Sequence, residues 1–259
     1  MCMNNNIDFS IITVVYNGEE NIEKTILSVI DQSYKNFEYI IIDGASTDST
    51  VEIIKKYENS IDYFISEKDN GIYDAMNKAI KVAKGKWINF MNCGDTFCDN
   101  EVLHNIIKNS ISDFSVIYGN VVRQWNSFIE VEFPNKKNFT MPFCHQSCFT
   151  KTEYLKKYGF DLSFKICADR NFYKVLQKND EYKALYLDLN ISNFDSINGV
   201  SSKNEILMLK EKSIIENMKK IKLYSLILKL KIKNIINSLF PEFINNLRKF
   251  RAHRNYLNH

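Results

Sequence analysis

Over its first 120 residues the chain alternates between short apolar runs and longer stretches whose apolar positions recur every three or four residues. The runs are rich in Ile, Val and Phe, which is typical of strands that are buried on both faces. One of the longer stretches begins STDSTVEII, with Ser, Thr and Asp where a helix would be capped. The predicted strands are FSIITVV (9–15), EYIIID (38–43), IDYFIS (61–66) and KWINFM (86–91). This alternation predicts an α/β domain with a mainly parallel sheet and right-handed crossovers.

Polar side chains follow each of the four predicted strands. Because the carboxyl ends of parallel strands meet at one edge of a sheet, these side chains are expected to converge on a ligand site there. In NFMNCGDTF (89–97) the carboxylate could also be an ordinary turn residue, since Asp and Gly commonly end a strand. Glu67 and Asp69, which follow the third strand, are interpreted as part of a solvated loop. The residues at the four strand ends are Tyr16, Asn17, Asp43, Glu67, Asp69 and Asp95.

Several motifs that would assign this sheet to another class are missing from the sequence. No Gly-x-Gly-x-x-Gly follows the first strand and no Gly-Lys-Ser/Thr occurs, so neither a dinucleotide dehydrogenase nor a P-loop NTPase is expected. A bound diphosphate would then need another source of positive charge, and a metal ion is the obvious candidate. The cysteine spacings, Cys93-x4-Cys98 and Cys144-x3-Cys148, do not match a zinc knuckle. We expect reduced thiols and no disulfide.

Two blocks of the sequence resemble the family 2 glycosyltransferases of the GT-A fold. The first comprises IITVVYNGEENIEKTILSVIDQSYKNFEYIIIDGASTDSTVEII and SEKDNGIYDAMNKAIKVAKGKWINFMNCGD. The second, weaker block runs from FCHQSCFTKTEYLKKYGFDLSFKICADRNFYKVL to ISNFDSINGVS. The chain is most similar to the branch that builds bacterial surface polysaccharides and O-antigen-like chains. The resemblance implies a Rossmann-like, mainly parallel sheet flanked by helices, with a helical extension at the C-terminus.

The resemblance also implies which residues bind the donor, a UDP-sugar. The first strand and its Tyr-Asn turn would wrap the base, and Asp43 would accept a hydrogen bond from the uracil. The start of the GIYDAMN helix would lie under the sugar nucleotide. The residues expected at the nucleotide-sugar site are Thr13, Val15, Tyr16, Asn17, Asp43, Asp74, Asn77, Asn92 and Gly94.

Asn92-Cys93-Gly94-Asp95 stands where the family has its D-x-D metal motif. Two of the usual acids are replaced, and Asp95 is the carboxylate that remains. Mg²⁺ is often bound through one or two carboxylates together with substrate phosphates. A divalent cation, Mn²⁺ or Mg²⁺, is therefore expected at Asp95. His145 in CHQSCF could be a further ligand, or it could be a structural hydrogen-bonding residue.

The resemblance implies that Asp169, in CADRNFYKVL, is the general base of an inverting transfer to a hydroxyl of the acceptor. The alternative for Asp169 is a helix N-cap, because helical periodicity begins there. Gln146, Asp195 and Ser196 are weaker candidates for the same cleft. Three other functions stay open: a sugar-1-phosphate nucleotidyltransferase, a glycoside hydrolase that uses Asp95 and Asp169, and a non-catalytic carbohydrate- or nucleotide-binding protein. The loop YNGEEN would repel the triphosphate that the first of these needs.

Charge divides the chain into two parts. Residues 1–202 carry 21 Lys and Arg against 27 Asp and Glu, whereas residues 203–259 carry 13 against 4. We expect a catalytic domain over 1–202, with a nucleotide-sugar half to about 120 and an acceptor half from 121, and a helical tail over 203–259. The helical pattern runs from Ile206 with few breakers to Pro241, where the helix is expected to restart.

The tail is basic and amphipathic, which is typical of a segment on an anionic membrane surface. Ile232, Ile235, Ile236, Leu239, Phe240, Phe243 and Leu247 would fall on one side of such a helix. A lid on the catalytic domain and a dimer contact are equally consistent with it, and nucleic acid is not an expected partner. A peripheral position on the cytoplasmic face of the inner membrane would suit a lipid-linked oligosaccharide acceptor. We otherwise expect a cytoplasmic protein, since the N-terminus has no apolar signal region.

Overall fold

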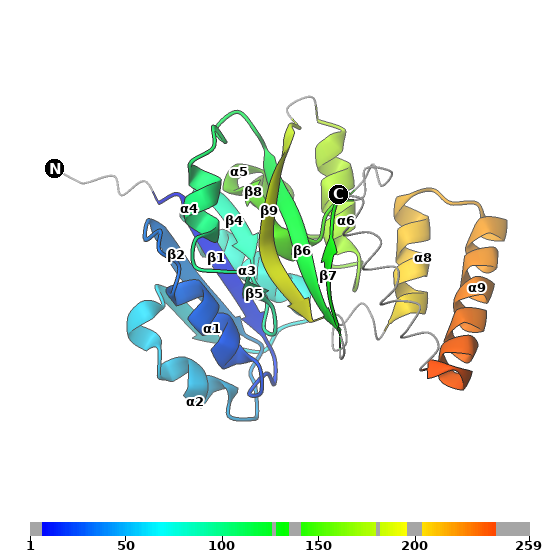
Figure 1. Ribbon diagram of the computed structural model, residues 1–259, viewed down its shortest axis with the longest axis horizontal. Coiled ribbons are helices and arrows are strands. Elements are labelled where there is room, and N and C mark those ends of the chain that lie inside the picture. The colour runs from blue at the N-terminus through cyan, green and yellow to red at the C-terminus, as the bar shows by residue number, and fades with distance from the viewer. Residues whose placement is uncertain (1–6, 126–127, 135–140, 180–181, 196–203, 242–259) are drawn as a thin grey trace.

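The computed structural model describes residues 7–125, 128–134, 141–179, 182–195 and 204–241. Within these ranges a nine-stranded mixed sheet forms the centre of the molecule, in the order β3-β2-β1-β4-β8-β6-β9-β5, with β7 paired to β6 (Figure 1). The first four strands are β1 (Phe9–Val15), β2 (Phe37–Asp43), β3 (Tyr63–Ser66) and β4 (Trp87–Phe90). All of their pairings with one another are parallel. The predicted α/β fold with a parallel first half is confirmed.

The remaining strands extend the sheet beyond β4. β8 (Cys148–Lys151) is antiparallel to β4, and β6 (Val116–Trp125) is antiparallel to β8 and parallel to β9 (Ala184–Asp195). The two-residue β5 (Thr96–Phe97) pairs with β9, and β7 (Phe128–Glu132) pairs with β6. The short 3-10 turn η2 (His145–Ser147) directly precedes β8. Two antiparallel reversals therefore bring the carboxyl ends of β6 and β9 back to the same edge as those of β1 and β4.

Helices cover both faces of the sheet. On one face lie α1 (Ile22–Ile30), α2 (Thr50–Lys55) and α4 (Val102–Ile107), and a 3-10 turn, η1 (Glu58–Ser60), follows α2. On the other lie α3 (Ile72–Val82), α5 (Thr152–Tyr158) and α6 (Ala168–Gln177). Each layer buries its own apolar cluster against the sheet. β1 pairs with β2 on one side and with β4 on the other, so the strand order reverses at β1. A crevice for a ligand is expected at the carboxyl ends of β1 and β4.

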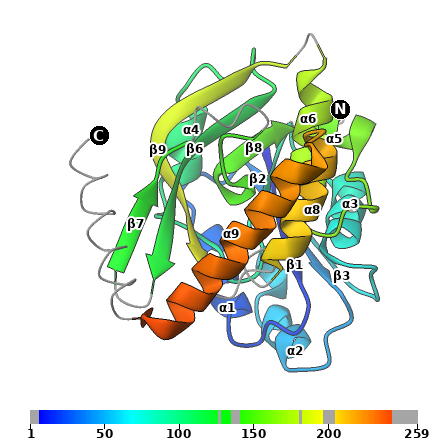
Figure 2. The ribbon, with the colours of Figure 1, turned by 90° about the vertical axis from the view of Figure 1, so that its right-hand side faces the viewer.

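The C-terminal extension forms a pair of helices rather than one long helix. α8 (Glu205–Ile215) and α9 (Lys220–Leu239) are separated by a turn in which Asn217 has φ 50°. This residue ends α8, because Asn tolerates the left-handed conformation better than most side chains do. The expectation of a nearly unbroken helical pattern from Ile206 is therefore wrong at this turn. α8 packs against α6 and α9 packs against α8, which leaves α9 outermost on that side of the molecule (Figures 1 and 2).

No helix in the described ranges is both long enough and apolar enough to cross a membrane. Phe243 and Leu247, which were expected on the apolar side of the tail, lie outside the described residues, as does Ser196.

Candidate active site

A tight turn at the carboxyl end of β4 contains Asp95, at the edge of the sheet where a ligand crevice is expected. The backbone amide of Asp95 donates to Asn92 O at 2.9 Å, and Gly94 has φ 100°, a conformation that favours glycine. Thr25 on α1 fixes this turn: its hydroxyl donates to Asp95 O at 2.8 Å and accepts from Gly94 N at 3.0 Å. Asn92 and Asp95 are 7% and 5% exposed. The turn is therefore rigid, and its polar side chains are held largely away from bulk water.

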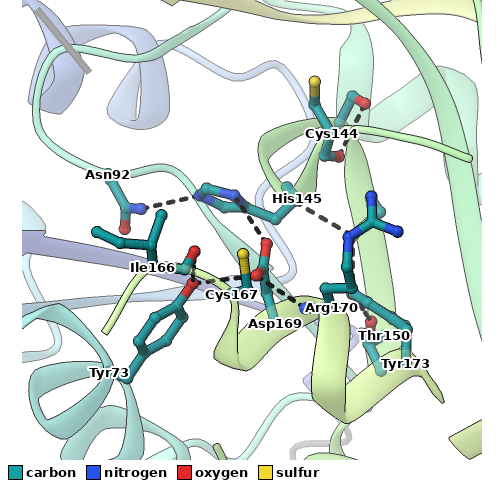
Figure 3. Close-up of polar contacts among 12 residues, drawn as sticks. Tyr73, Asn92, Cys144, His145, Thr150, Ile166, Cys167, Asp169, Arg170 and Tyr173 are labelled. Atoms are coloured by element: carbon teal, nitrogen blue, oxygen red, sulfur yellow. Dashed lines mark hydrogen bonds and ion pairs between the residues drawn. The ribbon is translucent and has the colours of Figure 1, made fainter. Parts of the chain in front are cut away.

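His145 connects this turn to Asp169 on α6 (Figure 3). Its Nε2 lies 3.1 Å from Asn92 Nδ2, and because an amide nitrogen only donates, Nε2 must be the acceptor. The ring proton of neutral His145 is then on Nδ1, which lies 3.7 Å from Asp169 Oδ2. Burial lowers the pKa of His145 from its ordinary value, against the opposing effect of Asp169. His145 is thus expected to be neutral at pH 7, bridging Asn92 and Asp169.

Asp169 lies in the first turn of α6 and is held by a tyrosine. Tyr73, the second residue of α3, shares its hydroxyl proton between Asp169 Oδ1 at 3.0 Å and Ile166 O at 2.8 Å. Burial, with Asp169 as the next contribution, raises the pKa of Tyr73 well above its usual range, so Tyr73 stays protonated as a donor. The N-cap of α6 is Cys167, not Asp169. The helix-cap interpretation of Asp169 is therefore wrong, and its carboxylate faces His145.

The thiol of Cys144 shows that the two carboxylates share one neighbourhood. The pKa of Cys144 is raised to about 12, chiefly by burial; the carboxylates of Glu132, Asp95 and Asp169 contribute in the same direction, whereas Arg123 acts in the opposite direction. Arg123 forms an ion pair with Glu132, and its Nη2 lies 3.8 Å from Cys144 Sγ. Asp95 and Asp169 are 74 positions apart in the sequence, and the fold places both within electrostatic reach of this thiol.

The expected base-binding residues fall into exposed and buried sets. Tyr16 is 64% exposed at the rim, and Asn17, with φ 48°, accepts from Thr47 N at 2.8 Å. Val15 and Thr13 are buried below the rim, and the Thr13 hydroxyl donates to Met91 O at 2.7 Å. Of these four residues, only Tyr16 and Asn17 are placed where a base could contact the side chain.

Asp43 already has partners within the protein. Its Oδ2 accepts from Ser46 N at 3.0 Å and from the Ser66 hydroxyl at 2.6 Å, and its Oδ1 accepts from the Ser46 hydroxyl at 2.5 Å. The residue is fully buried. Asp43 therefore ties together the loops that follow β2 and β3, and its contact with a uracil stays a prediction.

The side chain of Asp69 lies beside Gly44, close to Tyr16. The sequence alone predicts a solvated loop for this residue. A Cβ on Gly44 would lie 2.6 Å from Asp69 Oδ2 and 3.5 Å from Tyr16 Cβ, so a larger residue at position 44 would displace the Asp69 carboxylate from its present place. Asp69 Oδ1 accepts from Gly71 N at 2.9 Å. The sequence did contain a signal, because the Asp-Gly that ends β2 leaves room for a neighbouring side chain. Glu67, by contrast, forms a surface ion pair with Lys78 at 2.8 Å.

Asp74 and Asn77 on α3 are engaged in local structure. Asp74 Oδ2 accepts from Asn70 N at 2.9 Å, and Asn77 uses both ends of its amide on the backbone of Phe160, at 2.8 and 2.9 Å. The structure does not bring Asn77 into the group around Asp95 and Asp169. Among the weaker candidates, Gln146 is buried, and its backbone carbonyl accepts from Asn89 Nδ2.

The Asn92 amide offers one test of whether a cation fits here. Its Oδ1 is buried and has no hydrogen-bond partner. Among the described side chains, two other buried polar atoms are in the same state, Asn89 Oδ1 and Ser192 Oγ. An unpaired buried oxygen costs about 1–3 kcal/mol, so a ligand that satisfies it is the usual explanation. No cluster of three or more His, Cys, Asp or Glu side chains that could hold a metal occurs in the described residues. The donors present, Asp95 and Asn92 Oδ1, suit a hard cation that takes its remaining ligands from phosphate and water.

A buried carboxylate from the C-terminal extension holds the segment before Asp169. Glu211 on α8 is 6% exposed and accepts three backbone N–H groups, those of Lys165 at 2.7 Å and of Ile166 and Cys167 at 2.9 Å each. Sequence reasoning missed this contact, because Glu211 has the appearance of a solvated helix residue. α8 therefore holds the backbone segment that precedes α6, and the domain boundary at residue 202 stays a prediction.

Replacing Glu211 by Gln is expected to lower the free energy of unfolding by about 3 kcal/mol, since charge-assisted hydrogen bonds contribute roughly 1.5–3 kcal/mol each and the amide keeps one acceptor. The melting temperature should fall by roughly 6–12 °C. Glu205→Gln on the same helix removes a surface ion pair with Lys233, 3.8 Å away. This control substitution should change the free energy of unfolding by about 1 kcal/mol or less. Equal melting of the two variants would contradict the role given to Glu211.

Comparison with known proteins gives one family match and several similar structures. The sequence model described as "Glycosyl transferase family 2" matches residues 10–159. The Bacillus subtilis protein described as "Putative teichuronic acid biosynthesis glycosyltransferase TuaG" is 39% identical over 89 residues, which cover 33% of this chain and 35% of TuaG.

Two solved structures have the same fold. Staphylococcus aureus TarS 1-349 in complex with UDP-GlcNAc matches with a TM-score of 0.62 and 21% identity, over 76% of this chain and 61% of that one. The mannosyltransferase PcManGT of Pyrobaculum calidifontis, in complex with GDP-Man and Mn²⁺, matches with a TM-score of 0.62 and 16% identity, over 79% and 61%. This chain spans less than two thirds of the length of either solved chain.

Proposed function

The chain belongs to glycosyl transferase family 2, and from that premise we propose that it transfers a sugar, with inversion, from a UDP-sugar to a hydroxyl group of a surface-polysaccharide acceptor. The observation that carries the proposal is the link from Asn92 through His145 to Asp169. It puts a turn suited to a diphosphate on one side and a carboxylate suited to a base on the other. A single displacement needs a base and a leaving group on opposite sides of the reacting carbon.

Asp169 would remove the proton of the attacking hydroxyl. The acceptor oxygen forms a bond to the anomeric carbon while the bond from that carbon to the diphosphate oxygen breaks, and the acceptor proton moves to the Asp169 carboxylate. Tyr73 holds Oδ1 through its hydroxyl, which leaves Oδ2, the oxygen nearer to His145, for this proton. Neutral His145 keeps its Nδ1–H toward the same oxygen and so favours the ionised form of Asp169 before transfer.

Asp95 and Asn92 Oδ1 would hold a divalent cation together with the diphosphate. A bound Mn²⁺ or Mg²⁺ supplies positive charge that stabilises the departing UDP. In the absence of substrate His145 Nε2 accepts from Asn92, so His145 is a positioning residue here, and a direct ligand role would require that hydrogen bond to break. The Mn²⁺ in the structure of PcManGT supports the use of a divalent metal in this fold.

The rim beside Tyr16 favours a uracil over a guanine. Tyr16 offers an exposed ring for stacking, and Asp69 has one oxygen engaged with Gly71 N, which leaves Oδ2 beside Gly44. A single carboxylate oxygen matches the single N–H of uracil, whereas the paired N–H groups of guanine are best met by both oxygens. The UDP-GlcNAc bound to TarS supports a uridine donor, while the GDP-Man of PcManGT is the alternative that must be tested.

The acceptor is proposed to be a growing oligosaccharide linked to a lipid. The similarity to TuaG, a protein assigned to teichuronic acid biosynthesis, supports a cell-surface polysaccharide as the product. Asp169 faces His145, which lies in η2 directly before β8, and we propose that the acceptor hydroxyl enters on this side.

Thermal melts with UDP, GDP and NAD, each with and without Mn²⁺, test the proposed donor. A ligand at 100 times its dissociation constant stabilises a protein by about 2.7 kcal/mol. For a chain of this size the midpoint should rise by roughly 5–10 °C. We expect the largest rise with UDP and Mn²⁺ together. A rise with GDP that exceeds the rise with UDP would contradict the uridine donor, and no rise with either would contradict the nucleotide site.

A further inference from the structure

α9 has two apolar sides, and only one of them is used within the protein. Successive helical residues are about 100° apart, so Leu223, Leu226, Ile227 and Leu230 share the side that packs on α8 and is partly buried. The opposite side has no neighbour among the described residues (Figure 2). It consists of six exposed side chains, here called the outer face of α9: Ile221, Tyr224, Leu228, Ile232, Ile235 and Leu239.

The exposure of this outer face is large for apolar side chains. Ile221 is 84% exposed, and the other five are between 48% and 67% exposed. They follow one another at spacings of three and four residues, so they form a continuous stripe along the whole helix. A continuous exposed stripe of this kind marks an interaction site, whereas isolated apolar residues on a surface do not.

Lysine residues border the outer face on both sides. At 100° per residue, Lys220 and Lys231 lie along one edge of the stripe and Lys222 and Lys229 lie on its other flank, whereas Lys233 is turned toward α8, where it pairs with Glu205. All five are exposed, and α9 contains no Asp or Glu. Long lysine side chains can lie along an apolar surface with the charged group extended toward phosphate, which is the arrangement of a helix at a lipid headgroup layer.

We propose that the outer face of α9 docks on an anionic lipid surface, with the helix lying parallel to the plane of the membrane. A second copy of the chain fits less well, because pairing two outer faces would bring the four flanking lysines of one helix toward the four of the other, and α9 contains no Asp or Glu to balance them. Anionic headgroups, which are enriched in the cytoplasmic leaflet, supply that counter-charge. The inference concerns a surface remote from the donor site, and it does not rest on the proposed function.

Contacts of α9 with α8, and of α8 with the segment before α6, would fix how the catalytic domain is oriented when α9 lies on a membrane. Asn234 and Lys233 of α9 contact Glu205 at the start of α8, at 3.2 and 3.8 Å. Glu211 on α8 holds the backbone just before Asp169. Docking through α9 would therefore fix the orientation of the acceptor half relative to the membrane, where a lipid-linked acceptor is presented.

Co-sedimentation of the full chain with vesicles of phosphatidylcholine, with and without about a third of phosphatidylglycerol, tests the inference. We expect the chain to bind the anionic vesicles and not the vesicles of phosphatidylcholine alone. Binding should weaken in 0.5 M salt, because the Debye length at that ionic strength lies between about 3 and 10 Å and the exposed charges are screened. The double variant Leu228→Glu/Ile235→Glu should bind at least tenfold more weakly, while its melting temperature stays unchanged because both side chains are exposed. Ile129→Glu on β7, which also replaces an exposed isoleucine, is the matched control and should bind like the parent.

Two results would overturn the inference. One is the absence of binding to anionic vesicles, or binding that the double variant leaves intact. The other is a dimer in light scattering without lipid that the double variant converts to a monomer, which would assign the outer face to a second copy. UDP-induced stabilisation is measured separately, so failure of vesicle binding leaves the donor proposal standing, and the reverse also holds.

Discussion

Replacing Asp169 by Asn is expected to lower the rate of sugar transfer by about 10²–10⁴-fold, because losing a general base typically has that effect. Asparagine keeps an oxygen that can accept from the Tyr73 hydroxyl, 3.0 Å from Asp169 Oδ1, so the start of α6 should stay in place. The amide cannot take the proton of the acceptor hydroxyl. The affinity for UDP should be unchanged, since Asp169 lies on the acceptor side of His145.

The measurement is the initial rate of UDP release with saturating donor, alongside UDP affinity from calorimetry. Asp113→Asn is the matched control, because Asp113 is an exposed aspartate outside the site and should transfer at the parental rate. A rate for Asp169→Asn within threefold of the parent would remove Asp169 from the mechanism. A parallel loss of UDP binding would show instead that the substitution disturbs the fold of the site.

Replacing Asp95 by Asn is expected to remove the dependence of UDP binding on Mn²⁺ and to lower the transfer rate by about 10²–10³-fold, the range for losing one group that stabilises a developing charge. The turn itself should survive, since it is held by the backbone of Asn92, Gly94 and Asp95 and by the Thr25 hydroxyl. The effect should therefore be on the charge presented to the diphosphate, not on the position of the loop.

Titration of Mn²⁺ against both proteins at fixed UDP provides the measurement. Asp99→Asn, four residues further along in an exposed position, is the control, because its carboxylate accepts only the nearby Glu101 N at 2.8 Å. Mn²⁺-dependent UDP binding that persists in Asp95→Asn would contradict the metal site. UDP binding that is independent of Mn²⁺ in the parent chain would make the Asn92–Asp95 turn a metal-free variant.

The first half of the fold could be predicted because its pattern is local. Each strand from β1 to β4 is a short apolar run, and the polar residue that ends it can be identified directly from the sequence, as at Asp95. The order of the remaining strands depends on antiparallel pairings such as that of Ile88 with Thr150, 62 residues apart, which no local pattern encodes. Strand ends also shifted: 61–66 was predicted where β3 covers Tyr63–Ser66.

The sequence predicted which residue types form the site, but not which residues contact one another there. The sequence pattern identified Asp169 and His145 as candidates but not their partners. The hydrogen bond between Asn92 and His145 joins segments 53 residues apart, and the hydrogen bond from Tyr73 to Asp169 joins segments 96 residues apart. Glu211 was missed for the same reason, because a buried carboxylate that accepts distant backbone N–H groups is indistinguishable in sequence from a solvated one. The contact of Asp43 with the base stays a prediction; the hydrogen bonds of its carboxylate to Ser46 and Ser66, and the position of Asp69 beside Gly44, depend on how the loops after β2 and β3 pack together.

The most direct test of the central claim is turnover of the donor. The full chain would be incubated with a set of UDP-sugars, Mn²⁺ and a lipid-linked oligosaccharide fraction, and released UDP would be compared with the mass added to the acceptor. We predict one UDP released for each sugar added with at least one donor, and loss of both signals in Asp169→Asn. Stabilisation by UDP without turnover of any donor would contradict the account and indicate a nucleotide-binding protein that does not catalyse transfer.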